Sequence, residues 1–310
     1  MIKRMLIILI SIIILLSLLE IYVRIFHLND KFSKNNCPVY EYNINLLKFR
    51  DLEHNIEKDN NTYRILVLGD SFAYGIAVPF EKIFPRLIEQ NLNKNFNNAK
   101  IEVINCSQPG WNTEKEVNFC TEVFLPYKPN LVILSYVLND TECLMHHKEL
   151  TLNFWNKISF REPQFPLMKY LFVKSELIRY IYSRVESTRI KKEWLAGKFL
   201  FYREDNLCYK YFKRAVNKLS KLKTQNDFNV LVIIFPYFNV SLNGYPFIEL
   251  HKQVKNIFAE VGFDVIDLYD YYKKYSSEEL RACSLDAHPN ELAHSIAATV
   301  IANYITKIKR

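Results

Sequence analysis

Residues 63–71 read Tyr-Arg-Ile-Leu-Val-Leu-Gly-Asp-Ser, a short β-rich run that ends in a glycine and two polar residues. Apolar residues recur at helical spacing over residues 80–97, so the pattern predicts a strand, a polar loop and a helix. The same order recurs, with strands predicted at 101–105, 131–138, 230–235 and 265–267 and helices at 113–124, 209–222, 246–261 and 289–308. Continuous apolar strands that alternate with helices indicate a parallel sheet covered by helices on both faces.

The polar motifs of the chain lie where a ligand site of such a fold is expected. Ligands of an open parallel sheet bind beyond the carboxyl ends of its strands. Ser71 follows the first predicted strand, Gly110 lies beyond the second, and Asn139 follows the third. Asp286 and His288 stand just before the last predicted helix.

Ser71, His288 and Asp286 have the chemistry of a nucleophile, its base and an orienting carboxylate. A serine at a strand-to-helix turn can reach a substrate and use nearby backbone N–H groups. A histidine can accept the serine proton and return it to a leaving group, and a carboxylate can orient the imidazole. Each residue also has a structural alternative, because Ser71 and Asp286 could cap helices and His288 could be a surface residue.

Three groups could stabilise the negative charge that develops on oxygen during acyl transfer. They are the Ser71 N–H, the Gly110 N–H and the side-chain amide of Asn139, and we expect them to form an oxyanion hole. The alternatives are that Gly110 completes a turn after Pro109 and that Asn139 caps the segment after its strand.

These four segments resemble, in order, the conserved blocks of the SGNH (GDSL) hydrolase family, and the resemblance covers about residues 63–308. It implies a flavodoxin-like three-layer α/β/α fold, with ester hydrolysis or acyl transfer by a Ser71–His288–Asp286 triad. It also implies that neither a metal nor an organic cofactor takes part. The expected partners are ester-containing small molecules, lipids or O-acylated glycans.

The spacing Asp286-Ala287-His288 departs from the Asp-x-x-His of many family members. The shorter spacing is similar to that of extracytoplasmic SGNH-like enzymes that O-acetylate polysaccharides. We therefore expect a serine esterase or acylhydrolase, with an O-acyltransferase of a cell-surface polysaccharide as the alternative. A non-catalytic SGNH-like binding protein is a third interpretation, which the complete set of site residues disfavours.

The N-terminus predicts a membrane anchor. Residues 5–19 carry no charge, and extending the helix to residue 26 makes it long enough to cross a bilayer. The segment after the apolar run has no small-residue cleavage site, which favours an uncleaved anchor over a signal peptide. Lys3 and Arg4 precede the span and place the remainder of the chain outside the cytoplasm. We expect an anchor at 1–26, a polar tether at 27–61 and a catalytic domain at 62–310.

The remaining features of the sequence bound the function further. A helical insertion is predicted at about 142–206, either as a lid or as additional core. The net charge is +8, but the basic residues are scattered and form no nucleic-acid signature, so no nucleic-acid partner is expected. The six cysteines are even in number and would permit disulfides outside the cytoplasm, but they show no framework spacing, so buried free thiols are the favoured expectation. A metal at Cys143, His146 and His147 would need further ligands that the sequence does not place, so no metal site is expected there. His294 is expected to pack within the last helix.

Overall fold

Five parallel strands form one central sheet. In the computed structural model the strand order is β2–β1–β3–β4–β5, and every neighbouring pair is parallel. The strands are β1 (Thr62–Gly69), β2 (Lys100–Asn105), β3 (Leu131–Tyr136), β4 (Asn229–Ile234) and β5 (Asp264–Asp267). All 6 residues of β3 are buried, as expected for a central strand that is covered on both faces. The parallel sheet predicted from the sequence is confirmed.

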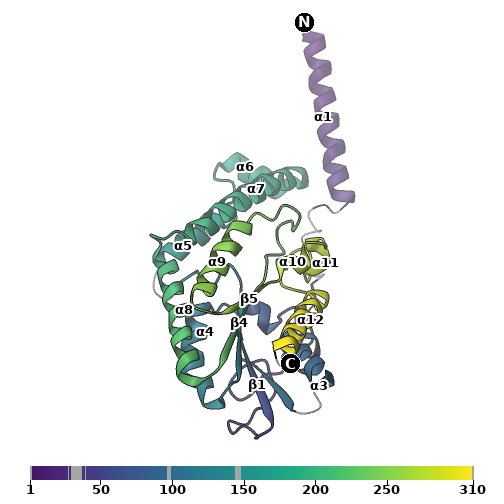
Figure 1. The fold of residues 1–310 in the computed structure, drawn as a ribbon. Helices are drawn as coiled ribbons and strands as arrows, with labels where there is room; N and C mark the ends of the chain where they lie inside the picture. The colour runs from purple at the N-terminus through teal and green to yellow at the C-terminus, as the bar shows by residue number, and fades with distance from the viewer. Residues whose placement is uncertain are drawn as a thin grey trace. The chain divides into compact units, whose positions relative to one another are not determined.

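Helices cover both faces of the sheet (Figure 1). On one face α3 (Phe84–Asn95) packs against α12 (Glu291–Ile308), and on the other α4 (Thr113–Phe119) packs against α8 (Leu207–Asn226). The shorter elements are α2 (Ser71–Tyr74), η3 (Phe80–Lys82), η4 (Cys120–Phe124), η5 (Leu125–Tyr127), α10 (Tyr269–Tyr272) and α11 (Ser277–Leu280). Helix α9 (Ile248–Glu260) packs beside β5. The predicted three-layer α/β/α order is therefore also confirmed.

The structure describes residues 2–26, 28, 37–38, 40–95, 99–143 and 148–308. Its contacts divide the chain into two compact units. The larger unit, residues 37–148 and 198–310, holds the sheet. The smaller unit consists of residues 1–36 and 149–197.

The smaller unit is helical. Its first helix, α1 (Ile2–Ile25), contains a span from Lys3 to Ile25 that is long and apolar enough to cross a membrane, a property that signal sequences share. The helices α5 (Lys148–Ile158), α6 (Pro166–Lys174) and α7 (Glu176–Phe201) occupy the stretch where the sequence predicts a helical insertion.

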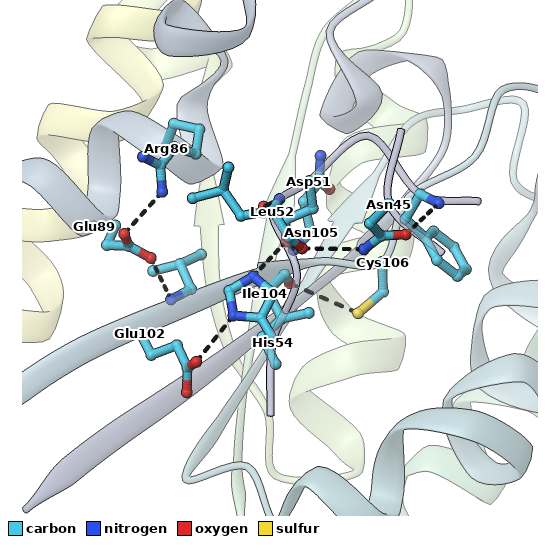
Figure 2. Close-up of polar contacts among 12 residues, drawn as sticks. Asn45, Asp51, Leu52, His54, Arg86, Glu89, Glu102, Ile104, Asn105 and Cys106 are labelled. Carbon is cyan, nitrogen blue, oxygen red and sulfur yellow. Dashed lines mark hydrogen bonds and ion pairs between the residues drawn. The ribbon is translucent and has the colours of Figure 1, made fainter. Parts of the chain in front are cut away.

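Residues 45–58, which we expected to belong to a polar tether, pack against the edge of the sheet at β2. Phe49, Arg50 and Asp51 are buried. His54 lies between Asp51 and Glu102 of β2 (Figure 2), with its Nε2 atom 3.0 Å from Asp51 and its Nδ1 atom 2.9 Å from Glu102. Burial alone would lower the pKa of His54, but the two carboxylates together raise it to about 9. Asp51 and His54 are thus part of a packed charge cluster rather than of a solvated linker.

Two disulfides join four of the six cysteines, which corrects the expectation of free thiols. Cys37 is bonded to Cys283, and Cys143 is bonded to Cys208. The Cα atoms of the two pairs are 5.3 and 5.1 Å apart, within the usual range for a disulfide. The partners are 246 and 65 residues apart, so their pairing depends on the tertiary fold and leaves no local spacing signal. Cys106 and Cys120 are free and buried, as expected.

Candidate active site

Ser71 lies at the first turn after β1. The carboxylate of Asp70 caps the short helix α2 by accepting a hydrogen bond of 2.8 Å from the Phe72 N–H. A Cβ atom at Gly69 would lie 2.7 Å from the Cβ atom of Ala73 and 2.9 Å from that of Ser135, so only glycine fits where the chain leaves the sheet. Ser71 is the first residue of α2, and its N–H therefore has no acceptor within the helix.

His288 meets Ser71 from a loop 217 residues later in the chain. Its Nε2 atom lies 2.9 Å from the Ser71 hydroxyl oxygen, and its Nδ1 atom lies 2.5 Å from Oδ1 of Asp286. The same Asp286 oxygen accepts the backbone N–H of His288 at 2.9 Å, which is the turn that a two-residue spacing favours. The hydrogen bond from His288 lowers the pKa of Asp286, so this carboxylate stays ionised. The structure therefore brings together the three residues predicted as a triad.

The loop of His288 is a short antiparallel turn. Arg281 pairs with Pro289, the Ala282 N–H donates to the His288 carbonyl at 2.9 Å, and the Cys283 N–H donates to the Asp286 carbonyl at 3.2 Å. These bonds connect the two sides of the loop. The disulfide from Cys283 to Cys37 attaches the loop to the start of the larger unit.

Asn139 follows β3, and its side chain points to the carboxylate of Asp70. Its amide donates a hydrogen bond of 2.9 Å to Oδ2 of Asp70, the residue before Ser71. The hydroxyl of Tyr237 donates to the side-chain oxygen Oδ1 of Asn139 at 3.5 Å. Burial raises the pKa of Asp70, an effect that the hydrogen bond from Asn139 opposes. An amide nitrogen carries two hydrogens, so Asn139 has one more to donate.

Gly110 lies in an exposed turn beyond β2. The Trp111 N–H donates to the Gln108 carbonyl at 3.2 Å, and Gly110 has a φ of +74°, which is typical of the third position of a type II turn after proline. A side chain at this position would meet nothing within 4 Å. The turn that we considered as the alternative for Gly110 is present, and its N–H donor role remains a prediction.

The other titratable candidates lie away from the Ser71–His288 pair or outside the described residues. His294 lies in α12 and is buried, where its Nδ1 atom accepts the Phe84 N–H at 3.1 Å. Burial lowers the pKa of His294 to about 3, so it is neutral and packs as expected. Cys143 is in a disulfide, and His146 and His147 are outside the described residues. Among the residues that are described, no group of three His, Cys, Asp or Glu is placed to hold a metal.

Sequence reasoning missed Arg50, which is buried beneath the Ser71 loop. Its guanidinium donates to the carbonyls of Tyr74, Gly75 and Val78, which follow Ser71 by three to seven residues. Arg50 also lies 4.7 Å from the ring centroid of Tyr42. Its neighbours in the sequence, residues 46–52, mix apolar and charged residues, and no motif among them distinguishes Arg50 from a surface arginine.

Comparison with known proteins returns matches only among solved structures. No protein-family model matches the chain, and no curated protein matches it. An esterase from Pseudoalteromonas sp. covers 80% of this chain and 98% of its own, at 16% identity and a TM-score of 0.45. A lipase/acylhydrolase from Enterococcus faecalis covers 78% and 95%, at 15% identity and a TM-score of 0.45.

A third match, a two-domain esterase active on acetylated mannans, covers 80% of this chain but only 50% of its own, at 15% identity and a TM-score of 0.48. Lipolytic proteins of the G-D-S-L family are also among the matches. At such identities, and with TM-scores below 0.5, these matches carry no argument about the residues or the activity of this chain.

Proposed function

We propose that the chain is a serine esterase or acylhydrolase with Ser71 as nucleophile, His288 as general base and Asp286 as the residue that orients the imidazole. One observation carries this proposal. The imidazole of His288 contacts the Ser71 hydroxyl at 2.9 Å through Nε2 and Asp286 at 2.5 Å through Nδ1. A serine that serves only as a cap needs no such base, whereas a nucleophile does.

Acyl transfer would proceed in two halves. The Ser71 oxygen bonds to the ester carbonyl carbon while its proton moves to Nε2 of His288, and Asp286 stabilises the resulting imidazolium. The tetrahedral intermediate then collapses, the bond to the leaving alcohol breaks, and His288 returns the proton to that alcohol. In the second half His288 takes a proton from water, whose oxygen bonds to the acyl carbon. The bond from that carbon to the Ser71 oxygen then breaks, His288 returns the proton to this oxygen, and the acid leaves.

The developing oxyanion needs donors aimed at it, and three groups are proposed for this role. The Ser71 N–H is free of helical acceptors because it begins α2. Asn139 is fixed by its bond to Asp70 and retains a second amide hydrogen. The third proposed donor is the N–H of Gly110. Together they would stabilise the intermediate electrostatically, which is usually the largest catalytic contribution.

We also propose that the catalytic unit lies outside the cytoplasm, held at a membrane by α1. Disulfides persist in oxidising compartments, and the larger unit contains two of them. Lys3 and Arg4 at the start of α1 favour a cytoplasmic N-terminus. Protease added to sealed spheroplasts should then digest the chain beyond residue 28. Protection from that protease would reverse the topology.

The proposed activity is tested with a chain-length series of p-nitrophenyl esters and the full-length protein in detergent. Wild type and Ser241→Ala should turn over at least one ester, whereas Ser71→Ala should not. Ser241 is a suitable control because its hydroxyl is exposed and donates only to the Asn243 carbonyl at 2.8 Å in the structure. Turnover that persists in folded Ser71→Ala protein would remove Ser71 from its proposed role.

A further inference from the structure

Helix α6 of the smaller unit exposes large apolar side chains. It has no buried residue. Phe165, which precedes it, and Leu167, Tyr170 and Val173 within it are exposed by 57 to 79%. A run of large apolar side chains in water marks a surface that contacts a partner or a membrane.

The helix is nevertheless held in a defined position against its neighbours. The ring of Phe172 lies 5.4 Å from that of Tyr182 in α7 and 6.2 Å from that of Phe160, measured between centroids. Lys169 lies 3.7 Å from Glu162. One side of α6 therefore packs within the smaller unit, and its remaining apolar side chains point away from these contacts.

Hydrogen bonds connect the end of α6 and the start of α7 to the last turns of α1. The carboxylate of Glu20 accepts three hydrogen bonds from residues that begin α7, namely from the Ser175 hydroxyl at 2.7 Å, the Glu176 N–H at 3.0 Å and the Leu177 N–H at 2.8 Å. The guanidinium of Arg24 donates to the carbonyl of Lys174, the last residue of α6, at 3.2 Å. Both contacts lie within the smaller unit.

These contacts set the depth of α6 relative to a bilayer that α1 crosses. The uncharged stretch of α1 ends at Glu20, and the charged side chains of Glu20 and Arg24 in the last turns of the span mark the interfacial region between hydrocarbon and headgroups. Because Glu20 is bonded to the first turn of α7, the junction between α6 and α7 lies at this boundary. Lys169 and Lys174 can extend to the headgroups while neighbouring apolar side chains enter the acyl region.

We propose that α6 is a second membrane contact, with Phe165, Leu167, Tyr170 and Val173 inserted at the headgroup–acyl boundary of the bilayer that α1 spans. The proposal rests on the membrane anchoring that forms part of the proposed function, but not on the chemistry of Ser71. A lipid surface is favoured over a protein partner because the helix is attached to the membrane end of α1 by the bonds of Glu20 and Arg24.

The test uses the full-length protein reconstituted in lipid nanodiscs, with p-benzoylphenylalanine as a photo-crosslinker. It replaces Tyr170 in one variant and Leu167 in a second. Tyr271 of α10 is the matched control, an exposed tyrosine of the larger unit. Leu15, within the uncharged stretch of α1, is the positive control for the span. Irradiated samples are analysed by mass spectrometry for lipid adducts at each position.

The proposal predicts lipid adducts at positions 170, 167 and 15, and at least tenfold fewer at 271. Adducts at 15 without adducts at 170 and 167 would leave the anchor intact and overturn the role of α6. Crosslinks from 170 to another protein would overturn it in favour of a protein partner. Absence of lipid at 15 as well would overturn the proposal together with the anchor. Ester turnover, measured on the same samples, shows separately whether the proposed function stands.

Discussion

The loop that carries Ser71 is buried and held by backbone contacts, whereas the loop that carries His288 is half-exposed and held by its own turn and a disulfide. Beneath Ser71, Asp70 caps α2 and Arg50 donates to three carbonyls of the following residues. Around His288, the supports are the turn bond of Asp286, the pairing of Arg281 with Pro289 and the bond of Cys283 to Cys37.

The two halves of the site are therefore supported in different ways. The contacts around Ser71 come from buried side chains packed beneath its loop, whereas those of the His288 loop lie mostly within the loop and its flanks, and one disulfide joins it to a distant segment. We therefore expect turnover to depend more on the disulfide between Cys37 and Cys283, which supports the His288 loop, than on the one between Cys143 and Cys208.

The largest effect is expected from His288→Ala, which removes the base that joins the two loops. The catalytic constant should fall by about 10⁴ to 10⁶. The matched control is His251→Ala, because His251 also pairs with an aspartate, Asp267, at 3.0 Å. It should lose stability but keep its turnover per folded molecule. Equal losses in both variants would show that His288 acts only through folding.

Asn139→Ala should lower the catalytic constant by about 10² to 10³ with little change in the Michaelis constant, since one oxyanion donor contributes roughly 3 to 4 kcal/mol. Asn206, which caps α8 by accepting the Cys208 N–H at 2.8 Å, provides the control. Asn206→Ala should cost about 1 kcal/mol of stability and no turnover. A destabilised Asn139→Ala protein with full turnover would make Asn139 a structural cap.

The comparison is tested most specifically with the two disulfides. Either double serine variant, at Cys37 and Cys283 or at Cys143 and Cys208, should lose about 2 to 5 kcal/mol of stability. Only the first should also lose turnover per folded molecule, by about tenfold, or roughly 1.4 kcal/mol of transition-state stabilisation. Kinetics well below both melting temperatures separate the two effects. Equal turnover in the two variants would show that the disulfide does not position His288.

The smallest effect on turnover is expected at His54, where the consequence is a pH-dependent stability. The pKa of His54 is raised to about 9 in the folded protein. The stabilisation is therefore complete below the ordinary pKa of about 6.5 and is lost as the pH rises through 9. At pH 6 the free energy of unfolding of wild type should exceed that of His54→Gln by about 3 kcal/mol, because one pKa unit corresponds to about 1.4 kcal/mol. Denaturant unfolding from pH 6 to 10 would show a constant difference if the pairing contributed nothing.

The sheet and its helices could be predicted because each strand is a continuous apolar run and each helix has an apolar stripe. Ile88 and Leu92, for example, recur at helical spacing in α3 and are both fully buried. The positions of Ser71 and His288 followed from their places beside a strand and a helix. Their contact followed from the resemblance to SGNH hydrolases, since no local pattern connects residues 217 apart.

The parts that could not be predicted depend on long-range pairing. In the sequence nothing distinguishes Arg50 and His54 from solvated residues. Their partners, the carbonyls after Ser71 for Arg50 and Glu102 for His54, lie far away in the chain. The bond between Cys37 and Cys283 likewise requires two segments 246 residues apart to meet. Such contacts form only once the sheet is assembled, so one sequence carries no sign of them.

The central claim is that His288 activates Ser71, and covalent labelling by a fluorophosphonate tests it most directly. Full-length wild type should be labelled, and tandem mass spectrometry should locate the adduct on Ser71. His288→Ala should be labelled about 10³-fold more slowly, and Ser71→Ala should not be labelled at all. An adduct on another serine, or an undiminished labelling rate in folded His288→Ala protein, would contradict the account.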